Sequence, residues 1–118
     1  MASATEVRKL SRIVSSIRRH VAPNLPLQQL ALLLLVADAG EEGITMPEAA
    51  TKLEMGQTSV SKNAMMLSKY AEHHGSVMTI KGYDLISTAP DLRERRRLSM
   101  TLTPKGKEVI EKLVKEGI

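Results

Sequence analysis

The sequence has no cysteine, tryptophan or phenylalanine, and Tyr70 and Tyr83 are its only tyrosines. Without cysteine the chain can form no disulfide framework, no thiolate nucleophile and no cysteine-based zinc site. The shortage of aromatic rings leaves the core to aliphatic side chains and to seven methionines. Cysteine redox chemistry and cysteine-bound zinc are therefore excluded.

Long apolar runs are also absent. The stretch "LALLLLVA" at 30–37 is too short to span a bilayer. The N-terminal "MASATEVRKLSRIVSSIRRH" carries charge where a signal peptide has its apolar centre. We therefore expect a cytoplasmic protein without a membrane partner.

The residues of catalysis and metal binding are scarce. The only histidines are His20, His73 and His74, and no carboxylate pair stands at metal spacing beside them. On a helix, adjacent histidines point about 100° apart and cannot form one ligand face. No phosphate-cradling glycine pattern and no Ser-His-Asp arrangement occurs. The sequence predicts no metal, no cofactor and no enzymatic activity.

The charge, by contrast, is one-sided. Residues 1–56 carry six Lys/Arg and six Asp/Glu, whereas residues 57–118 carry eleven and seven, so the net charge of +4 lies in the second half. A localised basic surface is typical of nucleic-acid binding. The densest part is "DLRERRRLSM" at 91–100, with four arginines in five positions.

A length of 118 residues predicts a single domain, 1–118. Residues 1–22 are expected to contain a helix, because apolar side chains recur at spacings of three and four. That stripe consists of Val7, Leu10, Val14, Ile17 and Val21. Residues 27–40 are apolar almost all round and predict a central core helix that stops at Gly40.

A helix-turn-helix is expected next. Residues 44–46 form a very short strand, and Thr45 and Glu48 have the spacing of a capping box at the start of a short helix. Gly56 interrupts the pattern before a second helix that we expect to cover 57–73. At 100° per residue, one side of this helix gathers small and apolar side chains and the opposite side gathers polar ones. The first set is Val60, Ala64, Leu67 and Ala71, and the second is Thr58, Lys62, Met65 and Lys69.

Two strands follow, because residues 82–89 and 97–103 are rich in strand formers, with residues 90–96 at the tip of the hairpin. Thr103 and Pro104 then open a C-terminal helix over 104–118. The fold class is mainly α with a small β-hairpin, in the order α-α-β-α-α-β-β-α of a winged helix-turn-helix. The helix-turn-helix and wing occupy residues 44–103.

Three stretches resemble the MarR family of bacterial transcriptional regulators: "ITMPEAATKL", "LEMGQTSVSKNAMML" and "DLRERRRLSMTLTPKGKEV". The resemblance covers residues 44 to about 110 and implies a DNA-binding regulator in which the helix from Gln57 enters a major groove. The wing would then lie beside the minor groove and the backbone with Arg93, Arg95, Arg96 and Arg97. It also implies a small-molecule effector, often an aromatic acid, but no residue here specifies one.

The residue types agree with that assignment. Thr58, Ser59 and Lys62 are the candidates for contact with base edges. Phosphate contacts are expected from Gln57, Ser61, Asn63, Lys69 and the wing arginines. Strand alternation places Arg95 and Arg97 on one face and Arg96 on the other, and Asp91 or Glu94 is expected to hold one arginine. The alternative is a solvated hairpin tip beside an ordinary amphipathic helix.

The chain departs from the family pattern in two places. Residues 69–85 are longer than the usual link, so either the second helix extends or an insertion forms around 73–81. A single C-terminal helix stands where family members commonly have two. A homodimer is still expected, through Val7, Leu10, Val14, Ile17, Val109, Leu113 and Val114. Packing of the same stripe within one chain is the alternative.

The function expected is therefore sequence-specific recognition of double-stranded DNA by a transcriptional repressor or activator. Two other classes fit the same pattern. One is a winged helix that docks another protein, which the methionines Met65 and Met66 favour. The other is an architectural DNA-binding protein with little sequence preference.

Overall fold

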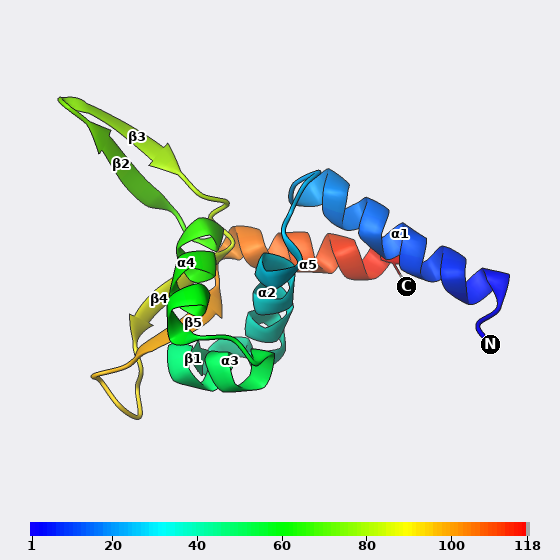
Figure 1. The fold of residues 1–118 in the computed structure, drawn as a ribbon, viewed down its shortest axis with the longest axis horizontal. Coiled ribbons are helices and arrows are strands. Elements are labelled where there is room, and N and C mark those ends of the chain that lie inside the picture. Colours follow the sequence, from blue (N-terminus) through cyan, green and yellow to red (C-terminus); the bar gives the residue numbers. More distant parts are fainter. Residues whose placement is uncertain (118) are drawn as a thin grey trace.

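The computed structural model describes residues 1–117. In Figure 1 the helices pack together and two β-hairpins project from them, one toward the upper left and one toward the lower left. The elements are α1 (Ala4–His20), α2 (Leu27–Ala39), η1 (Gly40–Glu42), β1 (Ile44–Thr45), α3 (Met46–Leu53), α4 (Gln57–Leu67), β2 (Tyr70–His74), β3 (Val77–Lys81), β4 (Ile86–Pro90), β5 (Leu98–Leu102) and α5 (Pro104–Gly117).

Helix α2 forms the centre of the core, as its continuous apolar sequence predicts. Leu32, Leu33 and Val36 are fully buried, and α2 packs against both α4 and β5. Gly40 ends the helix with a positive φ of 66°, a conformation that side chains other than glycine rarely adopt. The predicted core helix is confirmed.

The wing is a three-stranded antiparallel sheet in the order β1-β5-β4. Its register pairs Ile44 with Met100 and Ile86 with Leu102, so that the short strand β1 ties α3 to the wing. Met100 is fully buried, whereas Leu98 remains exposed near the tip. The predicted wing hairpin is confirmed, although its first strand begins at Ile86, four residues after the predicted start at 82.

Two predicted caps can be compared with the structure. The Thr103 hydroxyl accepts from the Gly106 amide at 2.9 Å and opens α5, as expected. At the start of α3 only half of the predicted capping box forms. The Thr45 hydroxyl accepts a hydrogen bond from the Glu48 amide at 3.3 Å. The Glu48 carboxylate accepts a hydrogen bond from the Thr45 hydroxyl at 3.0 Å, and not from the Thr45 backbone N–H as a full capping box requires.

Helix α4 is shorter than predicted. It ends at Leu67, where the Ser68 amide donates to the carbonyl oxygens of Ala64 and Met65. Residues 70–81 form the hairpin β2–β3, which the order α-α-β-α-α-β-β-α did not contain. Ala71 is therefore exposed on β2, and His73 and His74 lie in a strand instead of continuing the helix. Of the two explanations left open for this segment, the insertion is the correct one.

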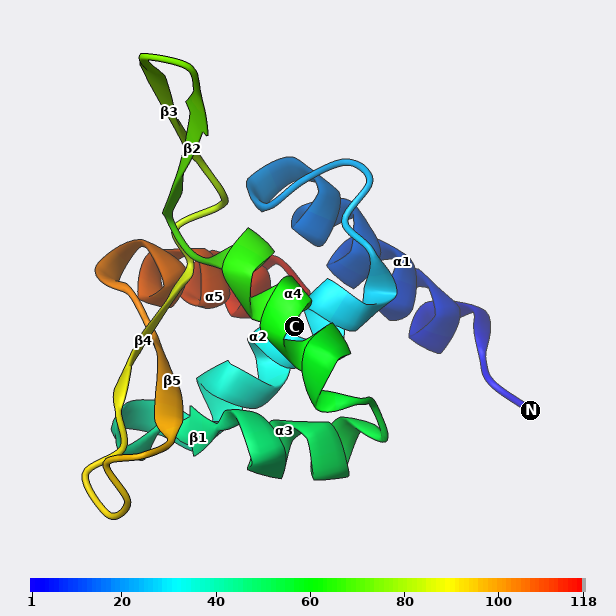
Figure 2. The same ribbon diagram turned by 60° about the vertical axis from the view of Figure 1, so that its left-hand side comes forward.

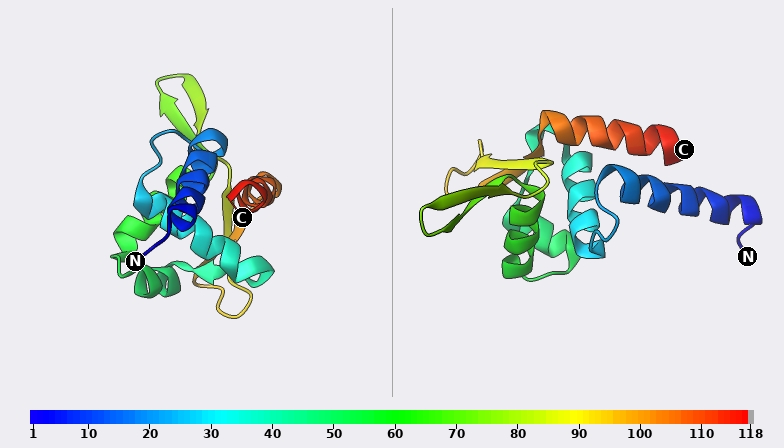
Figure 3. Two further views of the ribbon diagram at one scale, coloured as in Figure 1. Left: turned by 90° about the vertical axis from the view of Figure 1, so that its right-hand side faces the viewer. Right: turned by 90° about the horizontal axis from the view of Figure 1, so that it is seen from above.

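The three projecting parts point in different directions. The tip of β2–β3 lies opposite the tip of the wing in Figure 2, and the end view in Figure 3 shows the same arrangement. Helices α1 and α5 pack against each other and extend away from both hairpins toward the two termini. No helix within residues 1–117 is long and apolar enough to cross a membrane.

Candidate nucleic-acid interface

Helix α4 presents the polar side that its spacing predicts. Val60, Ala64 and Leu67 are buried against the core. Gln57, Thr58, Ser61 and Lys62 are exposed on the first two turns, while Ser59 is half-buried. The side facing solvent therefore begins with small hydrogen-bonding groups and one lysine.

The first turn of α4 also has free backbone donors. Gly56 precedes the helix and has no side chain, so no side-chain cap satisfies the first amides. These N–H groups and the positive end of the helix dipole attract anions such as phosphate. The start of α4 can thus attract a phosphate with its backbone N–H groups.

Two of the seven residues predicted on this helix do not belong to its exposed side. Asn63 is half-buried, and its amide donates to the Gln28 side chain of α2 at 3.4 Å. Lys69 is exposed but follows the end of α4. The predicted DNA contacts of both residues remain untested. Gln28, which the sequence pattern did not single out, lies exposed beside α4.

The wing loop, residues 91–97, is closed by its own backbone. The Asp91 amide donates to the Arg97 carbonyl oxygen at 2.9 Å, and the Arg97 amide donates to the Glu94 carbonyl oxygen at 3.0 Å. Glu94 accepts from the Arg96 amide at 3.4 Å. The loop is therefore a fixed turn that carries its arginines at defined positions.

Arg93 is the arginine held by acids. Its Nη2 atom lies 3.2 Å from Asp91 Oδ2 and 3.1 Å from Glu48 Oε1. The Arg93 side chain and amide both donate to Asp91, so the pKa of Asp91 is lowered, and the pKa of Arg93 is raised in return. Asp91 is buried while Arg93 is largely exposed. This confirms that Asp91 holds one arginine, and it joins the wing to the start of α3.

The other three wing arginines are free. Arg95, Arg96 and Arg97 are all exposed, and none forms an ion pair with any residue between 1 and 117. Strand alternation, on which the predicted division of these arginines between two faces rested, does not apply to them, because β5 begins only at Leu98. All three lie in the loop and form no ion pair with residues 1–117. Leu92 beside them is 96% exposed.

The predicted dimer residues fall into two groups. Ile17, Val109 and Leu113 pack inside the core of the chain itself, which corrects the prediction for these three. The rest stay exposed on the outer side of α1 and at the end of α5: Val7, Leu10, Val14 and Val114. An apolar hollow of about 150 Å³ adjoins them and is lined by Ile13, Ile17, Leu34, Ile110, Leu113 and Val114.

A carboxylate fastens α1 to α5. Glu116 on α5 accepts hydrogen bonds from Ser16, from His20 at 2.9 Å and from Arg19 at 3.0 Å. Donation by Ser16, followed by donation from His20 and Arg19, lowers the pKa of Glu116 to about 2. The two helices are thereby held in one orientation with the exposed apolar residues on their outer side.

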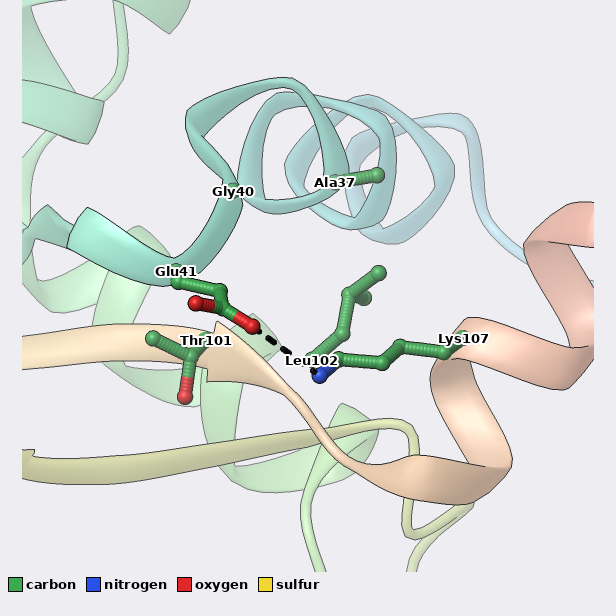
Figure 4. A pocket seen from close by; sticks show the side chains of 6 residues that line it. All are labelled: Ala37, Gly40, Glu41, Thr101, Leu102 and Lys107. Atoms are coloured by element: carbon green, nitrogen blue, oxygen red, sulfur yellow. Dashed lines mark ion pairs between the residues drawn. The ribbon is translucent and has the colours of Figure 1, made fainter.

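A larger hollow lies elsewhere, between the end of α2, β5 and the start of α5 (Figure 4). It encloses about 580 Å³ and has one opposed charged pair, Glu41 and Lys107, whose atoms are 3.9 Å apart. Its lining contains no aromatic side chain on which a flat ligand would stack. Residues 1–117 contain no group of three His, Asp or Glu side chains able to hold a metal ion.

Comparison with known proteins identifies the fold. No protein-family model and no curated relative matches the sequence. Solved structures do match: RV1404 from Mycobacterium tuberculosis has a TM-score of 0.72 at 18% identity and aligns with 96% of this chain and 66% of its own. The S. aureus MepR–DNA complex has a TM-score of 0.66 at 17% identity, and the alignment covers 92% of this chain and 73% of the MepR chain.

The MarR family transcription regulator SP03579 has a TM-score of 0.61 at 17% identity, and the alignment covers 97% of this chain and 64% of the SP03579 chain. The chain therefore has the winged-helix fold of MarR-type regulators, and the resemblance found in its sequence is confirmed at the level of the fold. It spans about two thirds of the length of these structures.

Proposed function

We propose that the chain is a transcriptional regulator that binds double-stranded DNA in a sequence-specific manner. The observation that supports this proposal most directly is that three arginines on the wing are exposed and form no ion pair with an acidic side chain in residues 1–117. Uncompensated guanidinium groups on a hairpin tip are suited to phosphates and to the negative potential of a narrow minor groove. The fold shared with the MepR–DNA complex supports the same assignment.

In this proposal α4 occupies a major groove. The free amides at its start bind a phosphate, and Thr58, Ser59 and Lys62 meet the edges of the bases. Gln57 and Ser61 contact the backbone on either side. The roles of the wing arginines differ, because Arg93 fixes the wing against Glu48 while Arg95, Arg96 and Arg97 reach the DNA.

The regulator would act as a homodimer. Val7, Leu10, Val14 and Val114 leave an apolar surface on α1 and α5 that the chain itself does not cover. A two-fold dimer buries the same patch on both copies and places two α4 helices on one side of a duplex. We assign no effector, because the lining of the hollow shown in Figure 4 has no aromatic side chain for stacking on a flat ligand.

The proposal is tested by selection of bound duplexes from a random-sequence library with the purified chain. A sequence-specific dimer enriches a motif with two symmetric half-sites about one helical turn apart. The variant Lys62→Ala should relax one position within each half-site without abolishing binding. Retention of duplexes without any enriched motif would indicate an architectural protein.

A protein-docking winged helix is the second candidate, and the 48% exposure of Met65 on α4 favours it. It predicts that no duplex is retained even at low salt. The same selection therefore separates the three classes, because each leaves a different product.

A further inference from the structure

The hairpin β2–β3 is the part of the molecule that the proposed function leaves unused. Its two strands pack mainly against each other and make far fewer contacts with the rest of the chain. All five residues of β3 are exposed, including Val77 at 61%, Met78 at 58% and Ile80 at 51%. An isolated two-stranded hairpin is at best marginally stable in water, so its apolar side chains are suited to a partner.

The base of the hairpin is fixed to the end of α4. The Tyr83 amide donates to the Met66 carbonyl oxygen at 3.1 Å, and the Leu85 amide donates to the Leu67 carbonyl oxygen at 2.8 Å. At Gly82, where φ is +95°, an added Cβ would collide with the Ser68 carbonyl oxygen. The hairpin therefore projects in a set direction, and its tip lies opposite the wing tip in Figures 1 and 2.

The outer edge of β3 offers unpaired backbone groups. The turn at Gly75 and Ser76 joins His74 to Val77, and Gly75 has the positive φ of 66° that such turns require. The residues that flank a two-residue turn bond to each other, and bonded and non-bonded pairs then alternate along the hairpin. The N–H and C=O groups of Met78 and Ile80 therefore point away from β2, toward solvent.

We propose that β3 pairs edge to edge with β3 of a second copy of this chain, antiparallel and centred on Thr79. In this register Met78 stands opposite Ile80 of the second copy, and their outward N–H and C=O groups bond to each other. Thr79 faces its own copy across the two-fold axis as a non-bonded pair. The arrangement is self-complementary, as a two-fold interface must be.

The charges on the hairpin favour β3 over β2 for this contact. An antiparallel pairing of β2 with itself, centred on its middle residue, would place Glu72 opposite Glu72, and directly opposed like charges destabilise a sheet. The only charge in β3 is Lys81, which would stand opposite Val77 and keeps its own ion pair with Glu72 at 3.0 Å. The middle of β3 carries no charge, such as edge strands often use to prevent pairing.

The contact is small. Two five-residue strands bury far less than the roughly 1,200 Å² typical of the smaller stable complexes. Pairing should therefore depend on concentration, and it should be strongest where other contacts already hold copies near each other. It does not rest on DNA binding or on the surface of α1 and α5.

Cross-linking through a single introduced cysteine tests the register, because the natural chain has none. In the full chain, Thr79→Cys places two sulfurs across the axis in a non-bonded pair, where side chains approach closely. Ala71→Cys is the matched control, since Ala71 is exposed on the neighbouring strand β2 and its replacement leaves the Glu72 charge in place. Under mild oxidation we expect at least ten times more disulfide-linked dimer from Thr79→Cys. Equal yields from the two variants would overturn the proposal.

A charge exchange tests the same contact without cysteine. Sedimentation velocity is measured with chains that all carry Leu10→Glu, which removes association through α1 and α5. The Met78→Lys/Ile80→Lys variant and the Met78→Glu/Ile80→Glu variant should each lose the concentration-dependent species formed by the parent chain, which is wild type in β3. An equimolar mixture of the two should regain it, since each lysine then faces a glutamate. The control Ser87→Lys/Leu92→Lys adds the same charge outside β3 and should behave as the parent chain does. Failure of the mixture to associate, or a parent chain without such a species, would refute pairing through β3.

Discussion

Replacement of Arg95, Arg96 and Arg97 by alanine should flatten the salt dependence of DNA binding. Each lost phosphate contact changes the slope of log affinity against log salt by about 0.9. Because all three arginines are exposed and without acidic partners in residues 1–117, we expect a change of about 2.7 for each bound chain. The penalty of the variant should then be about 40-fold larger at 50 mM salt than at 200 mM.

The measurement is fluorescence anisotropy of a labelled duplex at several salt concentrations. A random duplex suffices, because contacts with phosphate do not depend on sequence. The matched control replaces Arg8, Lys112 and Lys115 by alanine, which removes the same charge from α1 and α5, away from the wing.

Two results would refute the assignment of the free wing arginines to DNA. One is a triple wing variant with the slope of the wild type. The other is a control that loses as much slope as the wing variant, because the effect would then reflect net charge alone. Arg93→Ala provides a further contrast, since its main contacts are Asp91 and Glu48. It should loosen the wing and change the slope by less than one third of the triple variant.

Three further predictions concern stability and assembly. The pKa of Glu116 is lowered to about 2 in the folded protein, so its carboxylate contributes stability above the unfolded pKa near 4.5 and loses that contribution as the pH falls to about 2. The difference in Tm between wild type and Glu116→Gln should therefore vanish as the pH falls from 4.5 to about 2. Leu10→Glu should weaken dimers at least tenfold by sedimentation, with Ser11→Glu unchanged. Gly106→Ala should cost about 1–3 kcal/mol in urea unfolding, because its Cβ would collide with the Leu85 carbonyl oxygen.

Periodicity predicted the helices and wing because their apolar residues fall at regular spacing. It failed after Leu67, where Ala71 continues a helical spacing by coincidence. The chain leaves the helix there because the end of α4 bonds to Tyr83 and Leu85, which are distant in sequence. A local signal did exist, since Gly75 and Ser76 directly precede "VMTI", and a Gly-Ser pair before strand formers is typical of a tight hairpin turn.

The candidate site was predicted in outline for the same reason. The exposed side of α4 follows from spacing alone, and an acid holding one wing arginine follows from the neighbouring sequence. The choice of Arg93 depends on Glu48, which lies 45 positions away and meets the wing only because β1 pairs with β5. Nothing in the local sequence distinguishes Arg93 from the three arginines that remain free.

If α4 reads a major groove as proposed, its fixed end limits how much sequence the helix of one chain can read. Eleven residues form a helix about 16 Å long, which matches about five base pairs at 3.4 Å each. A sequence of five base pairs recurs by chance about once in a thousand positions, so a genome of about a million base pairs would offer roughly a thousand such sites. A single copy would therefore spend most of its time at irrelevant positions. Selective control of one gene requires several copies to read adjoining sequence together.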